Sequence, residues 1–418
     1  MLSFSAHAEE AKYDLRELSL WGLDPTLQQA NELAHYPSAM PGVVDTDRSR
    51  ANEARRLTPL SIITLHGEPL ADLEMDLRVQ SGRFVGHWPP AEAKSGRLRW
   101  LDLTGVEKTN PQALFATVDE KHWFVEARRI DGLYVQDKSR AERFLTYDCE
   151  LKYELPVQLA GGPDRYQISN SGKYALLDLF VIAPEGDGVR VGRLESLPPS
   201  KRGAAHAPAA SPTSGKKADK DGEGQGDKET RGQGDKAPAT PAAGSGPGQP
   251  AVAPLEPTEL TMSPVMPREA AELKAVGETI AGGLLKLGFT RLEIDLLVGR
   301  AANTWLEAKK MVVLFRLPVE AIEERLPLVA YPAPRKTLRA ALIVVDNIDP
   351  KIKLEVQKLI AQLGAAEYTD RESAEKRLTE LGRLAVPALR AALKSADLEV
   401  VFRAERILLA QNEKLEGT

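Results

Sequence analysis

The sequence has 418 residues, with 55 Lys and Arg against 60 Asp and Glu, and a formal net charge of −5. At ~150 residues per domain, this length predicts two or three domains. The charge balance gives no global electrostatic support for nucleic-acid binding. No apolar run approaches the ~18 residues that a membrane-spanning helix needs. The single cysteine excludes an intrachain disulfide and a cysteine-based metal site.

Residues 1–8 are interpreted as the remnant of a signal peptide or as a disordered N-terminus. Ala6-His7-Ala8 fits the small-x-small pattern that signal peptidase cleaves. A positively charged region before it is missing and the apolar stretch is short, as would result from a start codon assigned too late. We therefore expect an exported or periplasmic protein, with a chance match in a cytoplasmic protein as the alternative.

Residues 9–199 are expected to form a mainly-β domain of the sandwich or barrel type. The strongest signal is residues 144–155, where apolar and polar residues alternate as in a strand with one buried and one solvated face. Residues 72–80 alternate in the same way, and the Ser81-Gly82 turn predicts a hairpin with 83–88. Residues 24–56 are expected to be irregular or partly helical. Further strands are expected at 60–66, 97–103, 112–118, 122–130, 133–137, 174–183 and 189–194.

The residues of this part that could act in catalysis or binding are each explained by a structural role. Cys149 lies on the apolar side of its strand, so we expect a buried, inert thiol. His66, His87 and His122 lack the spacing of a metal site, so a shared metal ion is the minor interpretation. The aromatic residues are expected in the core, with a glycan-stacking platform as the alternative. No catalytic, cofactor-binding or metal-ligating residue is assigned, and no cofactor is expected.

Residues 200–254 are predicted to be a disordered linker. Val252 is the one large apolar residue, and most of the others are Gly, Pro, Ala, Lys, Asp, Glu, Ser and Gln, so the segment cannot offset the entropy of ordering it. Its basic and acidic residues are mixed, which indicates a flexible spacer between two folded parts and not a polybasic arm.

Residues 255–348 are predicted to form a small α/β unit. A helix is expected over 267–287, ended by Gly288. Thr290 and Glu293 form a capping box that begins a second helix, through about residue 308. Buried strands are expected at 311–315 and 338–345, with a short helix between them at 318–325.

Residues 349–418 are predicted to be helical. Helices are expected to begin at Asp349-Pro350, at a capping box of Thr369 and Glu372, at Pro387 and at Asp397. The arginines and glutamates of these helices are expected to form a solvated surface with pairs inside each helix.

A link and a helix start within this part carry a family resemblance. The link is Gly382-x-x-Ala385-x-Pro387-Ala388-Leu389, and the following helix start is Asp397-x-Glu399-Val400-x-x-Arg403-Ala404. Together they resemble a HEAT-type α-solenoid repeat over about 367–410. HEAT arrays stack several repeats, whereas this chain has one repeat with flanking helices. The resemblance implies binding or scaffolding, and the helical face of 385–410 is then the expected surface. Residues 9–199 resemble no family that we recognise.

These observations favour a non-enzymatic scaffold with a protein partner, in which a β-rich module is tethered to a HEAT-like docking module. The first alternative is an exported glycan- or envelope-binding protein that uses the aromatic β domain, which exposed Trp or Tyr clusters would favour. The second is a hydrolase of unrecognised type within 60–199, which a cleft holding two carboxylates with perturbed pKa values would favour.

Overall fold

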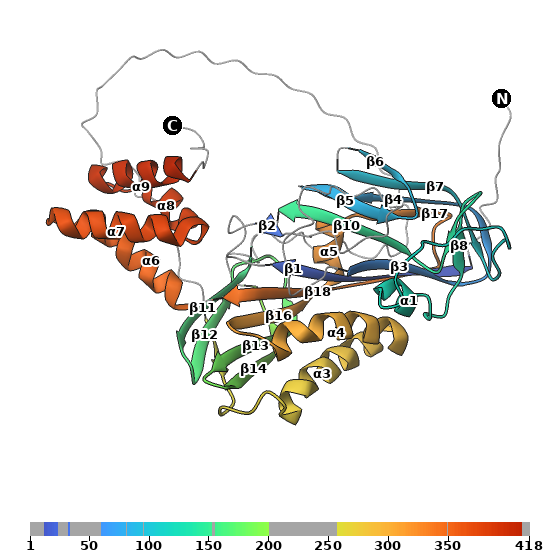
Figure 1. The fold of residues 1–418 in the computed structure, drawn as a ribbon, viewed down its shortest axis with the longest axis horizontal. Coiled ribbons are helices and arrows are strands. Elements are labelled where there is room, and N and C mark those ends of the chain that lie inside the picture. The colour runs from blue at the N-terminus through green and yellow to red at the C-terminus, as the bar shows by residue number, and fades with distance from the viewer. Residues whose placement is uncertain are drawn as a thin grey trace, which may run out of the picture.

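The computed structural model describes residues 12–23, 32–33, 60–80, 82–94, 96–152, 155–199, 257–348 and 350–411. Within these residues, nine strands form the largest sheet, with β5 paired to β10 beside the path β14-β13-β16-β18-β1-β3-β10-β2. The strands are β1 (Tyr13–Leu23), β2 (Glu32–Leu33), β3 (Leu60–Gly67), β5 (Gly82–Trp88), β10 (Leu145–Lys152), β13 (Leu176–Glu185), β14 (Gly188–Leu197), β16 (Met311–Leu317) and β18 (Lys336–Ile348). Figure 1 shows this sheet in the middle of the larger body.

Two smaller sheets accompany it in the described part of the chain. One follows the order β17-β4-β7-β8-β9, with β6 beside β7, and the other follows β11-β12-β15. Their strands are β4 (Leu70–Arg78), β6 (Glu92–Lys94), β7 (Arg97–Val106), β8 (Tyr134–Gln136), β9 (Ala141–Glu142), β11 (Val157–Gly162), β12 (Arg165–Asn170), β15 (Thr258–Thr261) and β17 (Leu328–Tyr331). One hydrophobic core joins both of them to the large sheet, so the N-terminal half is β-rich and includes packed sheets.

All three sheets contain strands from before residue 200 and from after residue 256. β18 pairs in parallel with β1, β16 pairs with β13, β17 pairs with β4, and β15 pairs with β12. The expected separation of a 9–199 domain from a 255–348 unit is therefore wrong. The two segments share their sheets and hydrophobic cores, because β18 and β16 lie beside β1 and β13 and bury apolar side chains together with them.

A buried ion pair also joins the two segments. Arg339 of β18 is fully buried and donates to Glu17 of β1. Glu17 also accepts from the hydroxyl of Tyr147 on β10, and burial raises the pKa of Tyr147 well above its usual value. A buried charge needs a partner of this kind, because unpaired it would lose its hydration without compensation.

Helices cover the other face of the large sheet. α3 (Ala271–Leu287) and α4 (Arg291–Leu306) pack with the short α1 (Trp123–Ala127) in a second hydrophobic core. α4 contacts β1 and β18, and α3 packs beside α4 and contacts β13. In Figure 1 both helices lie below the large sheet. Gly288 ends α3 in the left-handed region with φ of 103°, and Thr290 and Glu293 form the expected capping box of α4. The described part of the chain contains no helix that is long and apolar enough to cross a membrane.

Several expected elements are confirmed, and others differ in their pairing. The 144–155 strand is present as β10, and the strands expected at 174–183 and 189–194 are present as β13 and β14, which pair with each other. The hairpin of 72–80 with 83–88 is wrong, because β4 pairs with β7 and β17 whereas β5 pairs with β10.

Three other local expectations are wrong. Residues 122–130 contain helix α1 in place of a strand, because the His122 side chain accepts from the backbone N–H of Phe124 and caps the helix. Residues 112–118 hold an isolated bridge at Leu114 and no strand. The polar side of β10 is not solvated, since Thr146 and Asp148 are buried.

The C-terminal residues form four described α-helices with a hydrophobic core of their own. They are α6 (Pro350–Gln362), α7 (Tyr368–Leu381), α8 (Val386–Ala392) and α9 (Leu398–Ala410), and the short α5 (Val319–Arg325) lies earlier, between β16 and β17. Asp397 caps α9 as expected, whereas α7 begins after Glu367, so the expected capping box at Thr369 is wrong. The HEAT resemblance stays a prediction. The signal-peptide prediction for 1–8 and the linker prediction for 200–254 lie outside the described residues, as does most of 24–56.

Candidate functional site

The four C-terminal helices pack as neighbouring pairs. α6 contacts α7 and α8 contacts α9, while α6 also contacts α8 and α7 contacts α9. We call these four helices the helical unit. In Figure 1 it stands to one side of the sheets. Its core is made of small and branched apolar side chains that face inward from all four helices. The buried side chains are Val356, Leu363, Ala374, Leu378, Ala385, Val386, Leu389, Ala392, Val400, Ala404, Ile407 and Leu408.

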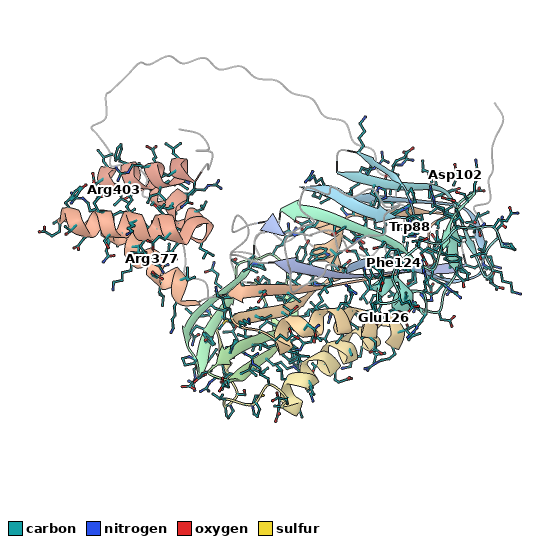
Figure 2. All side chains as sticks on the ribbon, viewed as in Figure 1. Trp88, Asp102, Phe124, Glu126, Arg377 and Arg403 are labelled. Atoms are coloured by element: carbon teal, nitrogen blue, oxygen red, sulfur yellow. The ribbon has the colours of Figure 1, made fainter. Side chains whose placement is uncertain are left out.

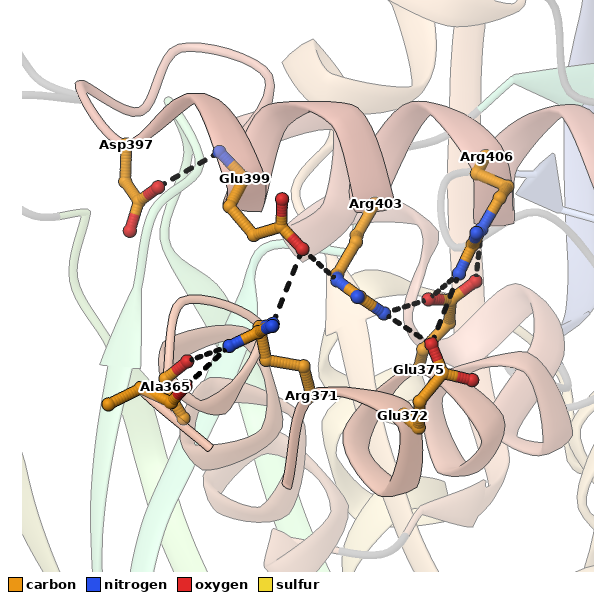
Figure 3. Close-up of polar contacts among 9 residues, drawn as sticks. Ala365, Arg371, Glu372, Glu375, Asp397, Glu399, Arg403 and Arg406 are labelled. Carbon is orange, nitrogen blue, oxygen red and sulfur yellow. Dashed lines mark hydrogen bonds and ion pairs between the residues drawn. The ribbon is translucent and has the colours of Figure 1, made fainter. Parts of the chain in front are cut away.

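An arginine–glutamate network holds α9 against α7 (Figure 3). Arg403 is only 5% exposed. Its Nη1 donates to Glu372 at 3.0 Å and to Glu375 at 2.6 Å, both on α7, and its Nε donates to Glu399 of α9 at 2.6 Å. Arg406 also donates to Glu375. The expected solvated surface with pairs inside each helix is therefore wrong at this position, because most of these contacts cross between helices.

Arg371 extends the network to the loop after α6. Its Nη1 donates to the backbone oxygens of Ala365 at 2.7 Å and Ala366 at 2.8 Å. Its Nε lies 3.3 Å from Glu399. One guanidinium thus links the end of α6, α7 and the first turn of α9, which fixes the orientation of α9 in the unit.

Substitution of Arg403 by methionine should destabilise the packing of α9 on α7. The guanidinium is buried and serves three carboxylates, so we expect Arg403→Met to lower the local free energy of unfolding by about 2–3 kcal/mol. Amide hydrogen exchange of the full chain, read by mass spectrometry, reports this as faster exchange of α7 and α9.

The matched control is Arg377→Met. Arg377 also pairs with two glutamates, Glu355 and Glu380, but its side chain is 46% exposed. Figure 2 shows both arginines in the helical unit. Exposed pairs add little stability, so exchange should hardly change in this variant. Equal exchange in the two variants would show that the buried network does not hold α9.

The outer side of α9 exposes large apolar side chains. Leu398 is 82% exposed, Phe402 is 60% exposed and Leu409 is 59% exposed. Positions 398, 402 and 409 are separated by four and seven residues, so they lie along one stripe of the helix. This stripe is opposite to the buried side that contains Ala404 and Ile407. We call it the α9 stripe. A sizeable exposed apolar patch of this kind is typical of an interaction surface.

The α9 stripe lies within the 385–410 face that the sequence indicates, but its residues differ from those that carry the HEAT resemblance. Val400 and Ala404 of that motif are buried in the core of the helical unit. The signal for the stripe was a second set of apolar residues on the nominally polar side of α9, namely Leu398, Phe402 and Leu409.

The residues considered for chemistry in the β-rich part are placed separately. Cys149 is buried in the core, as expected for an inert thiol. His122 caps α1, His87 is buried on β5, and His66 lies at the end of β3. In the described part of the chain, no three His, Cys, Asp or Glu side chains are placed to hold a metal ion together.

The tryptophans do not form a glycan-stacking platform. Trp21, Trp88, Trp100, Trp123 and Trp305 are all buried. Figure 2 labels Trp88 together with Phe124, which lies in the same hydrophobic core. The tryptophan faces are covered by neighbouring side chains and cannot stack on a sugar, so the form of the glycan hypothesis that relies on them is wrong.

A cleft within the β-rich part holds two carboxylates. It has a volume of about 400 Å³ and is lined by His66, Glu107, Asp131 and Arg143, among others. No Ser or Cys lines it. A side-chain nucleophile of the serine- or cysteine-hydrolase type is therefore absent from the cleft lining.

Comparisons with known proteins give no further guide to function. No family model, no curated protein and no solved structure matches the chain.

Proposed function

We propose that this chain is a non-enzymatic interaction protein in which the helical unit is the docking module. The observation that carries the proposal is the α9 stripe, with Leu398, Phe402 and Leu409 each more than half exposed. The resemblance of 367–410 to a HEAT-type repeat supports the same function, because solenoid repeats bind through the exposed sides of their helices.

The occupant that we propose is an amphipathic helix of a protein partner. α9 contacts α7 with one side, whereas Leu398, Phe402 and Leu409 on its other side are each more than half exposed. Three apolar side chains along one helical stripe match the apolar positions that a second helix presents every three or four residues. The buried network of Arg403 keeps α9 in place. A partner that binds the stripe therefore causes little further loss of conformational entropy in this chain.

The test uses the full chain as bait in native cell extract, with two double variants. Phe402→Glu with Leu409→Glu places charges in the α9 stripe. Leu285→Glu with Leu287→Glu places the same charges on exposed leucines of α3 and is the control. A partner whose cross-links map to α9, and that the α9 variant loses while the control retains it, supports the proposal.

Other results would overturn it. A partner retained equally by both variants docks elsewhere on the chain. Gel filtration with light scattering would detect a wild-type dimer that the α9 variant converts to a monomer, in which case the occupant is a second copy of this chain. A monomeric wild type that retains no protein would remove the docking function altogether.

A further inference from the structure

The cleft beside His66 is built by loops at one end of the β-rich part. His66 and Gly67 come from the end of β3, Glu107 follows β7, Gly132 precedes β8, and Arg143 lies between β9 and β10. Its volume of about 400 Å³ is within the range of small-molecule sites.

The hydrogen bonds around His66 fix which ring nitrogen carries the proton. Thr64 donates its hydroxyl proton to Glu293 at 2.8 Å, and both side chains are buried. The oxygen of Thr64 can then accept from Nε2 of His66, which lies 3.0 Å away. Nε2 is also 3.3 Å from Glu293. A carboxylate and a committed hydroxyl are acceptors, so Nε2 carries hydrogen, which leaves Nδ1 as the ring nitrogen that can accept.

Gly132 places the cleft wall against the other edge of this ring. A Cβ at this position would come 2.8 Å from the backbone oxygen of Leu65 and 3.7 Å from Nδ1 of His66. Glycine therefore lets the loop approach β3 closely, and no side chain at position 132 covers the Nδ1 edge. The lone pair on Nδ1 makes this edge a hydrogen-bond acceptor.

Arg143 supplies the donor side of the cleft. One of its nitrogens donates to the backbone oxygen of Gly132, and the guanidinium stacks on Tyr134 at 3.8 Å from the ring centroid. These contacts hold the group in place, and a guanidinium has further N–H donors to offer. Its Nε is buried and makes no hydrogen bond.

Two carboxylates complete the lining. Glu107 and Asp131 are exposed, and neither forms an ion pair within the described residues. The cleft thus offers three acceptor groups, which are the two carboxylates and Nδ1 of His66, together with one fixed guanidinium. An ammonium group matches the acceptors, and a carboxylate matches the guanidinium.

We propose that this cleft binds a free α-amino acid as a zwitterion. Its ammonium group lies toward Glu107, Asp131 and Nδ1 of His66, and its carboxylate lies toward Arg143. The inference concerns a part of the chain that the docking proposal does not use, so either can fail alone.

The test compares three probes that differ by one charged group. Norvaline carries both charges, butylamine lacks the carboxylate, and pentanoate lacks the ammonium group. Isothermal titration of the full chain should give saturable binding of norvaline, with each single-charge probe at least about tenfold weaker. Butylamine binding as tightly as norvaline would contradict the role of Arg143. Absence of saturable binding by norvaline would overturn the site.

Variants assign the binding to the cleft. Glu107→Gln with Asp131→Asn changes two exposed side chains, so folding is unaffected, and it should weaken norvaline binding about tenfold or more. Glu195→Gln, an exposed carboxylate on β14, is the control and should leave binding unchanged. The ¹⁵N shift of Nδ1 in His66 gives a second readout, because an acceptor lone pair shifts when a donor binds it. Unchanged binding in the double variant, or an unchanged Nδ1 shift, would contradict the proposal.

Discussion

A chain cut after residue 199 should not fold. Without residues 257–348, β1 loses its parallel partner β18 and β13 loses β16, so the large sheet is divided in two and each of these long strands becomes an open edge. The same cut uncovers the sheet face that α3 and α4 protect, and it leaves Glu17 without Arg339. Each of these losses is large against a total stability of about 5–15 kcal/mol. The expected product is an unfolded or aggregating chain.

Co-expression of residues 1–199 with residues 257–418 gives the decisive comparison. We expect the two fragments to purify together as a stable complex, because the pairings and cores that they share need no covalent connection. Residues 1–199 alone should show no dispersed amide spectrum. A well-dispersed spectrum for that fragment alone would establish an independent domain and contradict the shared sheet.

Loss of the charge on Glu293 should have the second largest effect, with a clear pH dependence. Burial alone would raise the pKa of this carboxyl, but hydrogen bonds from His66, Thr290 and Thr64 outweigh it and lower the pKa from 4.5 to about 2. The carboxylate therefore stabilises the fold at pH values above 4.5, and this contribution is lost as the pH falls toward 2. A difference of about 2.5 pH units corresponds to about 3 kcal/mol.

Glu293→Gln isolates this contribution. Glutamine can keep the capping box with Thr290 but cannot carry the charge. Urea unfolding followed by tryptophan fluorescence at pH 3 to 7 should show the variant about 3 kcal/mol less stable at pH 7, with this difference narrowing as the pH falls from 4.5 to 3. Glu278→Gln, at an exposed pair with Arg291, should follow the wild type. A gap that is constant across this pH range would show that the carboxylate titrates normally.

The elements that the sequence predicts well are those that local contacts determine. The alternation of 144–155 gives β10, the apolar run of 311–315 gives β16, and the capping box at Thr290 begins α4. The pairing of the strands is not predicted in this way. The periodicity of a strand shows which of its sides is buried, but it does not show which other strand lies beside it. Residues 83–88 thus form a strand next to a turn, yet the partner is β10 and not the preceding strand.

The prediction of a linker at 200–254 led to a wrong division into domains for the same reason. Composition identifies 200–254 as a segment unable to build a core, but it does not say whether the flanking residues belong to one core or two. Of the two sites, the helical face of 385–410 could be predicted from its sequence motif. The hydrogen bonds around His66 could not, because they involve Thr64 and Glu293, which are separated by 229 residues in the sequence.

The parallel pair of β1 and β18 also constrains how the protein is made. Asp14 lies opposite Lys336 and Leu23 lies opposite Val345. A strand near the start of the chain therefore cannot pair until a strand more than 300 residues later in the sequence has been made. During synthesis, β1 leaves the ribosome long before its partner has been translated. Pairings between such distant segments slow folding and expose unpaired strands in the meantime. A nascent chain of this protein should therefore depend on chaperones until residue 348 has emerged, while the helical unit, with mostly local contacts, forms last and quickly.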